Sequence, residues 1–319
     1  MRAAIRVRVV AAAALGCVLV LDFGFAGSAR AFDDFEGTRA VGMGGSGRAW
    51  ALADSAVLLN PSGMSLAKAY NVEASYAYGS RLREQFLHAS VVDSTSATGL
   101  AGGLYYTYRF DKTTGLAAGH GHEVGGALSL PIGTSVAVGG TLKWFRLVGA
   151  DNGAASPATA TWDGFTTDVG ATVRPDPTLS FAVVGVNLVD KHRGQVPRMV
   201  TYGAAYLPIP EIVLALDGVT SFTRDDVTGT RGTGLRAGIE GALAQRVALR
   251  AGGGTDPVAG MGFLAAGLSA VSEMGALDVG VRGDLFQYGT GGTRNLFLGV
   301  SLRLFVPGAV ASAAAAQTQ

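Results

Sequence analysis

Apolar side chains alternate with polar or small ones along most of this chain, in segments of about ten residues. The stretch that begins at Tyr70 reads YNVEASYAY, and the stretch that ends at Phe305 reads NLFLGVSLRLF. A period of two places successive side chains on opposite faces of a β-strand. The pattern therefore predicts a chain built almost entirely of strands, each with one apolar face and one polar or small-residue face.

Composition decides which face meets which environment. Charged residues make up 15% of the chain, against about one quarter in a typical soluble domain, and glycine occurs 48 times in 319 residues, about twice its usual share. Mean hydropathy is positive at +0.32. Beyond residue 31, no uninterrupted apolar run reaches the roughly 18 residues of a membrane-spanning helix. This combination predicts an all-β protein, a transmembrane antiparallel β-barrel of about 14 strands with its apolar faces outward.

A secreted β-sandwich is the main structural alternative, because it also has alternating strands. A sandwich buries its apolar faces and should carry charge outside, whereas here the second face is rich in Gly, Ala, Ser and Thr. Short connections should also alternate with longer ones if the strands cross a membrane. The strands are predicted near 70–80, 84–93, 98–110, 120–131, 134–149, 163–174, 178–189, 198–207, 211–222, 233–243, 246–254, 261–271, 275–285 and 294–305.

The N-terminus has the pattern of a secretory signal peptide over residues 1–31. A basic start is followed by an apolar region at 9–21 and by the small-x-small sequence Ala29-Arg30-Ala31. Cys17, the only cysteine of the chain, lies inside this leader and leaves a lipoprotein as a less favoured alternative. We expect an exported protein without disulfides, in which 32–69 forms an N-terminal plug, 70–305 the barrel and 306–319 a flexible tail.

The plug segment contains a glycine-rich motif, GMGGSG, that satisfies the dinucleotide pattern G-x-G-x-x-G. That fingerprint needs a buried strand before it and an acidic residue about twenty positions later. The upstream residues 32–37 read FDDFEG, and no β-α-β units follow. We therefore expect a compact segment instead, with a short helix or turn over 50–59 that ends at Asn60-Pro61, since a residue before proline avoids helical geometry.

The segment RAVGMGGSGRAWALADSAVLLNPSGMSLA resembles the N-terminal region of the FadL-type (TodX-like) and PorV/PorQ-type outer-membrane barrels. Those proteins begin with a glycine-rich stretch and a D-x-x-A-v-x-x-N-P-[AS]-G-[LM] turn. This chain matches the turn at Asp54, Ala56, Val57, Asn60, Pro61, Gly63 and Met64. The resemblance extends over nearly the whole chain beyond the leader and is specific for the superfamily more than for either branch.

The resemblance implies a monomeric fourteen-strand barrel in the outer membrane of a Gram-negative bacterium, with a hatch in its lumen. FadL-type members take up small hydrophobic molecules such as fatty acids, which leave sideways through a gap in the wall. PorV-type members are accessory barrels of protein secretion and bind a secretion-system partner. The external loops of this chain are short and carry little apolar surface, which is closer to the PorV branch, so both functions stay open.

Two sets of residues are candidates for function. The hatch residues would gate a ligand, although glycine and Asn-Pro also have backbone reasons to be in a turn. Inward-facing charges, balanced in sign, would pair across the lumen and with the hatch rather than select ions. The hatch candidates are Gly42, Gly44, Gly45, Asp54, Asn60, Pro61 and Gly63, and the lumen candidates are Glu73, Lys143, Asp168, Asp217, Arg236, Glu240, Arg250, Asp278 and Arg282.

Enzymatic, metal and cofactor chemistry find little support in the sequence. The nucleophile motif G-x-S-x-G is absent, and His120-Gly121-His122-Glu123 lacks an evident fourth metal ligand. The near-neutral charge gives no nucleic-acid footprint. We expect a non-enzymatic protein without cofactor or metal, whose partners are outer-membrane lipid, a small hydrophobic ligand or a secretion partner, and the barrel-assembly machinery that reads its last strand from Gly299 to Phe305.

Overall fold

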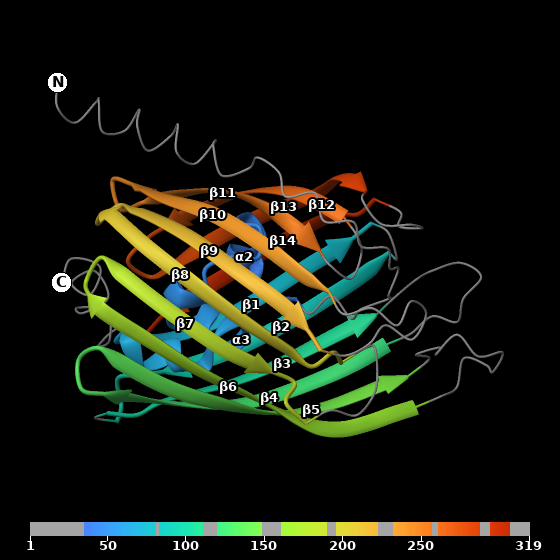
Figure 1. Cartoon of the computed structure of the whole chain (residues 1–319), viewed down its shortest axis with the longest axis horizontal. Coiled ribbons are helices and arrows are strands. Elements are labelled where there is room, and N and C mark those ends of the chain that lie inside the picture. Colours follow the sequence, from blue (N-terminus) through green and yellow to red (C-terminus); the bar gives the residue numbers. More distant parts are fainter. Residues whose placement is uncertain are drawn as a thin grey trace.

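The computed structural model describes residues 35–80, 83–97, 99–110, 120–148, 161–189, 196–222, 232–256, 261–287 and 294–306. These residues form one closed barrel in which each strand pairs with its neighbours in sequence and β14 pairs with β1. All of the pairings are antiparallel. Figure 1 shows the strands inclined to the long axis of the barrel. The predicted fold class, a fourteen-strand transmembrane-type barrel, is confirmed.

The strand positions follow the predicted segments closely. The largest differences are at β3, which begins at Ala101 instead of 98, and at β7, which ends at Val186 instead of 189, while β6 is longer by two residues at each end. The strands are β1 (Tyr70–Gly79), β2 (Glu84–Asp93), β3 (Ala101–Phe110), β4 (His120–Ile132), β5 (Val136–Val148), β6 (Thr161–Asp176), β7 (Leu179–Val186), β8 (Met199–Ile209), β9 (Ile212–Ser221), β10 (Thr233–Leu243), β11 (Val247–Asp256), β12 (Met261–Val271), β13 (Gly275–Gln287) and β14 (Leu296–Phe305).

At one end of the barrel, which we call the short-turn end, most consecutive strands are joined by short connections. The links 133–135, 177–178, 210–211, 244–246 and 272–274 lie there. They contain three residues at most, and the sixth link at this end, 94–100, is longer. Outer-membrane barrels have their short turns on the periplasmic side.

The wall is continuous over β2, β3 and β4, where a lateral gap would favour the transporter interpretation. The register runs without a shift from Gln85↔Phe110 to Asp93↔Gly102, and from Ala101↔Ser129 to Phe110↔His120. Register shifts occur in other places, between β6 and β7, β8 and β9, and β12 and β13. Gly102 and Gly103, which could have permitted a kink in β3, are therefore part of regular pairing.

The outer face of the barrel is apolar along its strands. Leu104, Leu128, Leu142 and Leu216 are each more than half exposed, and the other large exposed apolar side chains recur at every second position of the strands. Such a surface would be costly in water and is the surface that a lipid bilayer solvates. Arg146, which falls on this face by parity, is exposed two residues before the external end of β5.

Among the described residues, no helix is both long enough and apolar enough to cross a bilayer.

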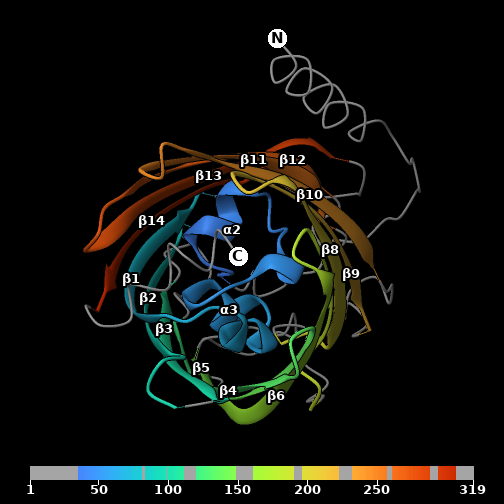
Figure 2. The same ribbon diagram turned by 90° about the vertical axis from the view of Figure 1, so that its left-hand side faces the viewer.

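The described part of the N-terminal segment, residues 35–69, lies inside the barrel (Figure 2). It contains two short α-helices, α2 (Thr38–Gly42) and α3 (Asp54–Leu59), and two 3₁₀ helices, η1 (Arg48–Trp50) and η2 (Pro61–Leu66). Within the predicted short helix or turn over 50–59, the α-helix starts only at Asp54, and Trp50 belongs to η1. Asn60 does end that helix, with an extended backbone before Pro61. We call residues 35–69 the plug.

The predicted signal peptide (1–31), the first plug residues (32–34) and the tail from 307 onward lie outside the described residues.

Candidate functional site: the plug and the inner wall

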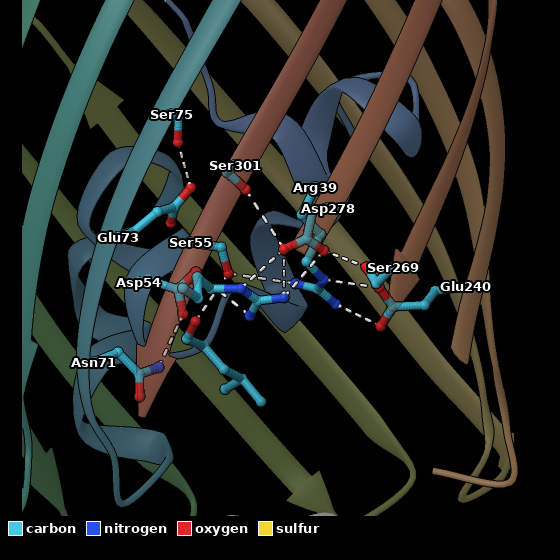
Figure 3. Close-up of polar contacts among 12 residues, drawn as sticks. Arg39, Asp54, Ser55, Asn71, Glu73, Ser75, Glu240, Ser269, Asp278 and Ser301 are labelled. Carbon is cyan, nitrogen blue, oxygen red and sulfur yellow. Dashed lines mark hydrogen bonds and ion pairs between the residues drawn. The ribbon is translucent and has the colours of Figure 1, made fainter. Parts of the chain in front are cut away.

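The plug is bound to the wall through buried and half-buried ion pairs. Arg39 of α2 makes a two-pronged contact with Glu240 of β10, at 2.8 Å from Nε to Oε2 and 2.9 Å from Nη2 to Oε1. Glu240 also pairs with Arg250 of β11, whose Nη1 lies 3.2 Å from Asp278 Oδ1 of β13. Figure 3 shows this chain of alternating charges running from the plug along neighbouring strands. Paired guanidinium and carboxylate groups are the form in which charge is tolerated in such a buried place.

Asp54, at the start of α3, belongs to the same network of charges and joins it through Arg303 of β14. Its Oδ2 lies 3.5 Å from Nη1 of Arg303, and its Oδ1 accepts a hydrogen bond of 3.1 Å from Asn71 Nδ2. Arg303 in turn contacts Asp278 at 2.9 Å. Burial opposes the charge of Asp54, but Arg303 and hydrogen bonds from Glu73 and Asn71 outweigh it, and the pKa of Asp54 lies below its ordinary value. Asp54 is therefore the anion that ties α3 to β14 and β1.

A second ionic cluster holds the start of the plug and η1. Glu36 accepts from Arg236 Nη1 of β10 at 2.7 and 2.9 Å and also contacts Arg48. Arg48 donates to Asp217 of β9 from its backbone N at 3.0 Å and from Nη1 at 3.3 Å. Burial raises the pKa of Glu36, but the two arginines outweigh burial, so that this pKa is lowered overall.

The Asn60-Pro61-Ser62 turn is hydrogen-bonded to the wall at β6. Asn60 is fully buried, and its Nδ2 donates to Thr172 Oγ1 at 2.8 Å and to Arg48 O at 3.0 Å. Its Oδ1 accepts from Ser62 Oγ at 2.7 Å. Ser129 of β4 donates to Ser62 O at 2.8 Å. The Asn60 side chain thus forms hydrogen bonds both within the turn and to the wall. These bonds explain an asparagine at this position better than turn geometry alone.

Inward-facing glycines allow the plug backbone to touch the wall. A Cβ on Gly139 of β5 would lie 2.6 Å from Pro61 C, and one on Gly252 of β11 would lie 2.3 Å from Met43 C. A Cβ on Gly42 of the plug would lie 2.9 Å from Gly267 Cα of β12. Contacts this short exclude any side chain larger than hydrogen, so these glycines form a cradle for the plug. Gly170, Gly203, Gly238 and Gly280 are similarly close to plug or lumen groups.

The remaining hatch candidates have local roles. Gly44 and Gly45 adopt left-handed conformations with φ of +68° and +71°, which favour glycine. A Cβ on Gly63 would lie 1.9 Å from Ala51 O, so Gly63 permits the crossing of two plug segments. Pro61 begins η2 and faces the cradle at Gly139.

The side of the plug that faces β1 to β4 is mainly apolar, apart from the contacts of Asp54 with β1 and of Ser62 with β4. Val57, Leu59 and Met64 pack with Val92, Ala101 and Ala127 in one buried cluster. Phe35 packs with Phe86, Phe297 and Ala77 in another, and Leu58 touches both clusters. The ring centroids of Phe35 and Phe86 are 6.0 Å apart, and those of Phe86 and Phe297 are 5.8 Å apart. Apolar contact therefore extends along this side of the lumen.

The predicted lumen charges lie on the inner face, and most are joined to each other or to the plug. Glu73, Lys143, Asp168, Asp217, Arg250 and Asp278 are buried, while Arg236, Glu240 and Arg282 are half-buried. Lys143 pairs with Asp168 at 2.9 Å, apart from the plug clusters, and Arg282 lies 3.8 Å from Asp284. The structure thus brings Glu73, Asp217, Arg236, Glu240, Arg250 and Asp278 together around the plug and leaves Lys143, Asp168 and Arg282 elsewhere in the lumen.

The barrel and its plug were compared with known proteins in sequence and in structure. No family model matches the chain, and no curated protein matches it in sequence. Among solved structures, the CymD monoaromatic hydrocarbon channel has a TM-score of 0.66 at 13% identity and covers 86% of this chain and 99% of its own. The chain has the FadL fold.

Two further structures carry the same fold. The Ralstonia pickettii toluene transporter TbuX has a TM-score of 0.63 at 11% identity, covering 84% of this chain and 97% of its own. A Pseudomonas aeruginosa FadL homologue has a TM-score of 0.58 at 11% identity, covering 89% and 99%. At these identities the likeness concerns the FadL fold alone and does not extend to the roles of individual residues.

Several residues that hold the plug of this FadL-fold barrel were missing from the sequence-based candidates. Glu36, Arg39 and Arg48 make its main ionic contacts, and Trp50 packs beneath Arg174 of β6. The charge of the plug residues is visible in the sequence, but their partners lie about 170 to 200 positions away. The cradle glycines could have been noticed as glycines that fall on inward positions of the alternation.

Acid should loosen the plug of this FadL-fold barrel. The pKa values of Glu36 and Asp54 are lowered from 4.5 and 3.8, so both carboxylates stabilise the docked plug at neutral pH. That stabilisation is lost as the pH falls through the lowered values. We expect Trp50 fluorescence, measured with Trp144 and Trp162 replaced by Phe, to change reversibly below about pH 4.

A variant that carries Glu36→Gln and Asp54→Asn together is the control for the acid transition. It should lose much of the transition, because neither position can then titrate. A transition that is unchanged in this variant would show that other groups control the plug.

Proposed function

We propose that the protein is an outer-membrane barrel that binds small hydrophobic molecules and passes them inward, with the plug as its hatch. The observation that carries the proposal is the two-sided attachment of the plug. One side is bound to β9, β10 and β14 by ion pairs, whereas the other meets β1–β4 mainly through Phe35, Leu58 and Met64. An apolar molecule can compete for the second side without breaking a buried ion pair.

The fold supports this proposal. CymD is a monoaromatic hydrocarbon channel and TbuX a toluene transporter, and both share the architecture of this chain. The apolar outer face supports placement in a membrane, and the short-turn end would face the periplasm. A cleaved leader over residues 1–31 would deliver the chain to the envelope.

A PorV-like accessory barrel is the second candidate, and one observation favours it. The backbone pairing of β2, β3 and β4 is unbroken, so this part of the wall offers no gap for a ligand to leave sideways. In that case the plug would be a permanent filling of the lumen, and the partner would be a secretion-system protein.

Uptake by a host strain that lacks its own hydrophobic-molecule channels tests the proposal. Cells that express the protein should accumulate radiolabelled toluene or dodecanoate faster than cells with an empty vector. Native mass spectrometry of the detergent-solubilised protein should then show a bound apolar molecule. Equal accumulation in both strains, together with a copurifying protein chain, would overturn the transporter and favour the accessory barrel.

A further inference from the structure

Arg174 differs from the other inward-facing cations that have been described. Arg236, Arg250, Arg303 and Lys143 each have a carboxylate partner on a strand or on the plug. Arg174 Nε and Nη2 are buried without a hydrogen-bond partner among the described residues. These two donors have lost their hydration without gaining a hydrogen bond in return, and an anion bound there would supply one.

Its position is the short-turn end of the lumen. Arg174 follows inward-facing Gly170 and Thr172 on β6 and lies two residues before the end of that strand. The nearest acidic residue in sequence, Asp176, is exposed, and its Oδ1 accepts hydrogen bonds from Thr178 N and Oγ1. Among the described residues, no carboxylate forms an ion pair with Arg174.

The plug covers Arg174 with an aromatic ring. The guanidinium carbon lies 4.4 Å from the centroid of the Trp50 ring, in a cation–π contact. Trp50 also packs against an apolar cluster formed by Ala49, Ala182, Ala205, Leu207 and Val213. The region thus combines a cation that lacks an anion with apolar wall surface, and a plug residue connects the two.

We propose that Arg174 binds the carboxylate of an amphipathic, fatty-acid-like ligand at the periplasmic end of the lumen, and that Trp50 moves aside to admit it. The proposal rests on the proposed function and specifies its substrate class. The carboxylate accepts from Nε and Nη2, the two donors that are now without partners, in the forked geometry that arginine offers. The alkyl chain replaces the indole against Leu207 and Val213. A ligand held here leaves along the barrel axis, consistent with the continuous wall of β2–β4.

Titration in lipid nanodiscs tests the site. With Trp144→Phe and Trp162→Phe as background, Trp50 becomes the single tryptophan and reports on its own displacement. Dodecanoate should change its fluorescence, dodecan-1-ol should bind about tenfold more weakly or worse, and acetate should have no effect at the same concentrations. Arg174→Gln should weaken dodecanoate about tenfold or more, whereas Arg174→Lys should retain part of the affinity. Native mass spectrometry of the same samples counts the bound molecules.

Arg146→Gln, on the outer face near the opposite rim, is the matched control and should bind dodecanoate normally. A heat-dependent shift in gel mobility verifies that each variant forms a barrel. Dodecanoate binding that is unchanged in Arg174→Gln, or dodecan-1-ol binding as tight as that of dodecanoate, would overturn the site. If toluene uptake persists in that case, the proposed function stands without it. If wild-type protein takes up neither toluene nor dodecanoate, the proposed function itself fails.

Discussion

A disulfide between the plug and β3 should abolish uptake reversibly. A Cβ on Gly103 would lie 3.0 Å from Cγ2 of Val57, which is about the distance between Cβ of one cysteine and Sγ of the other in a disulfide. Val57→Cys with Gly103→Cys should therefore form a bond with little backbone movement. The neighbouring Met64 Sδ, also 3.0 Å from that Cβ, belongs to a flexible side chain that can move away.

The disulfide fixes α3 against the apolar side of the lumen, where we propose that the ligand passes. Oxidised cells should accumulate toluene and dodecanoate at the rate of the empty vector, and a membrane-permeant reductant should restore wild-type uptake. Background thiols do not interfere, because the chain has a single cysteine, Cys17, within the predicted leader.

The two single-cysteine variants control for the substitutions and should transport whether oxidised or reduced. Full uptake by the oxidised double variant, with the disulfide verified by mass spectrometry, would show that the plug need not move. Such a result would mean that ligands cross the barrel without displacing α3.

Filling the glycine cradle should detach the plug while the wall still forms. In Gly252→Val, the new Cβ would lie 2.3 Å from Met43 C and O and 2.7 Å from Gly44 N, all of them backbone atoms that cannot rotate away. Overpacking of this kind costs about 1–3 kcal/mol, which raises the undocked population between about fivefold and more than a hundredfold. Trypsin should then cleave after Arg48, which is 4% exposed in the docked plug, at a correspondingly higher rate.

Gly241→Val is the matched control, because a Cβ at Gly241 on the same barrel has nothing within 4 Å. It should leave both the tryptic cleavage rate and the heat-dependent gel shift as in the wild type. Intact-mass spectrometry of the digest identifies the cleavage. Equal protection of Arg48 in Gly252→Val and wild type would contradict a cradle that depends on glycine.

The barrel wall was predictable because its signal is local. Each strand has to present apolar groups to lipid at every second residue, so the pattern around Tyr70 or Leu298 reveals its strand without knowledge of any other. The predicted start of β3 at 98 was wrong because Gly99 and Leu100 belong to the preceding turn, where Gly99 has φ of +75°. Glycine gives no alternation signal by which that boundary could be recognised.

The plug was predictable only in part. The Asp54 to Gly63 motif placed a turn before the first strand, and Asn60 does end a helix there. No local pattern indicated that Trp50 lies outside that helix, or that Arg39 would be a main anchor. Both depend on where the wall stands relative to the plug.

The all-β class, the number and approximate bounds of the strands, and the inward-facing side chains all follow from the amino-acid sequence. Those features follow from a two-residue period and a lipid environment that act on each segment separately. The contact partners are known only from the folded chain, since Arg39 meets Glu240 across 201 positions of sequence and Met43 lies directly against Gly252 of the wall. Closure of the barrel brings these groups together, and in the part of the chain that the structure describes it leaves Arg174 facing Trp50 without a carboxylate.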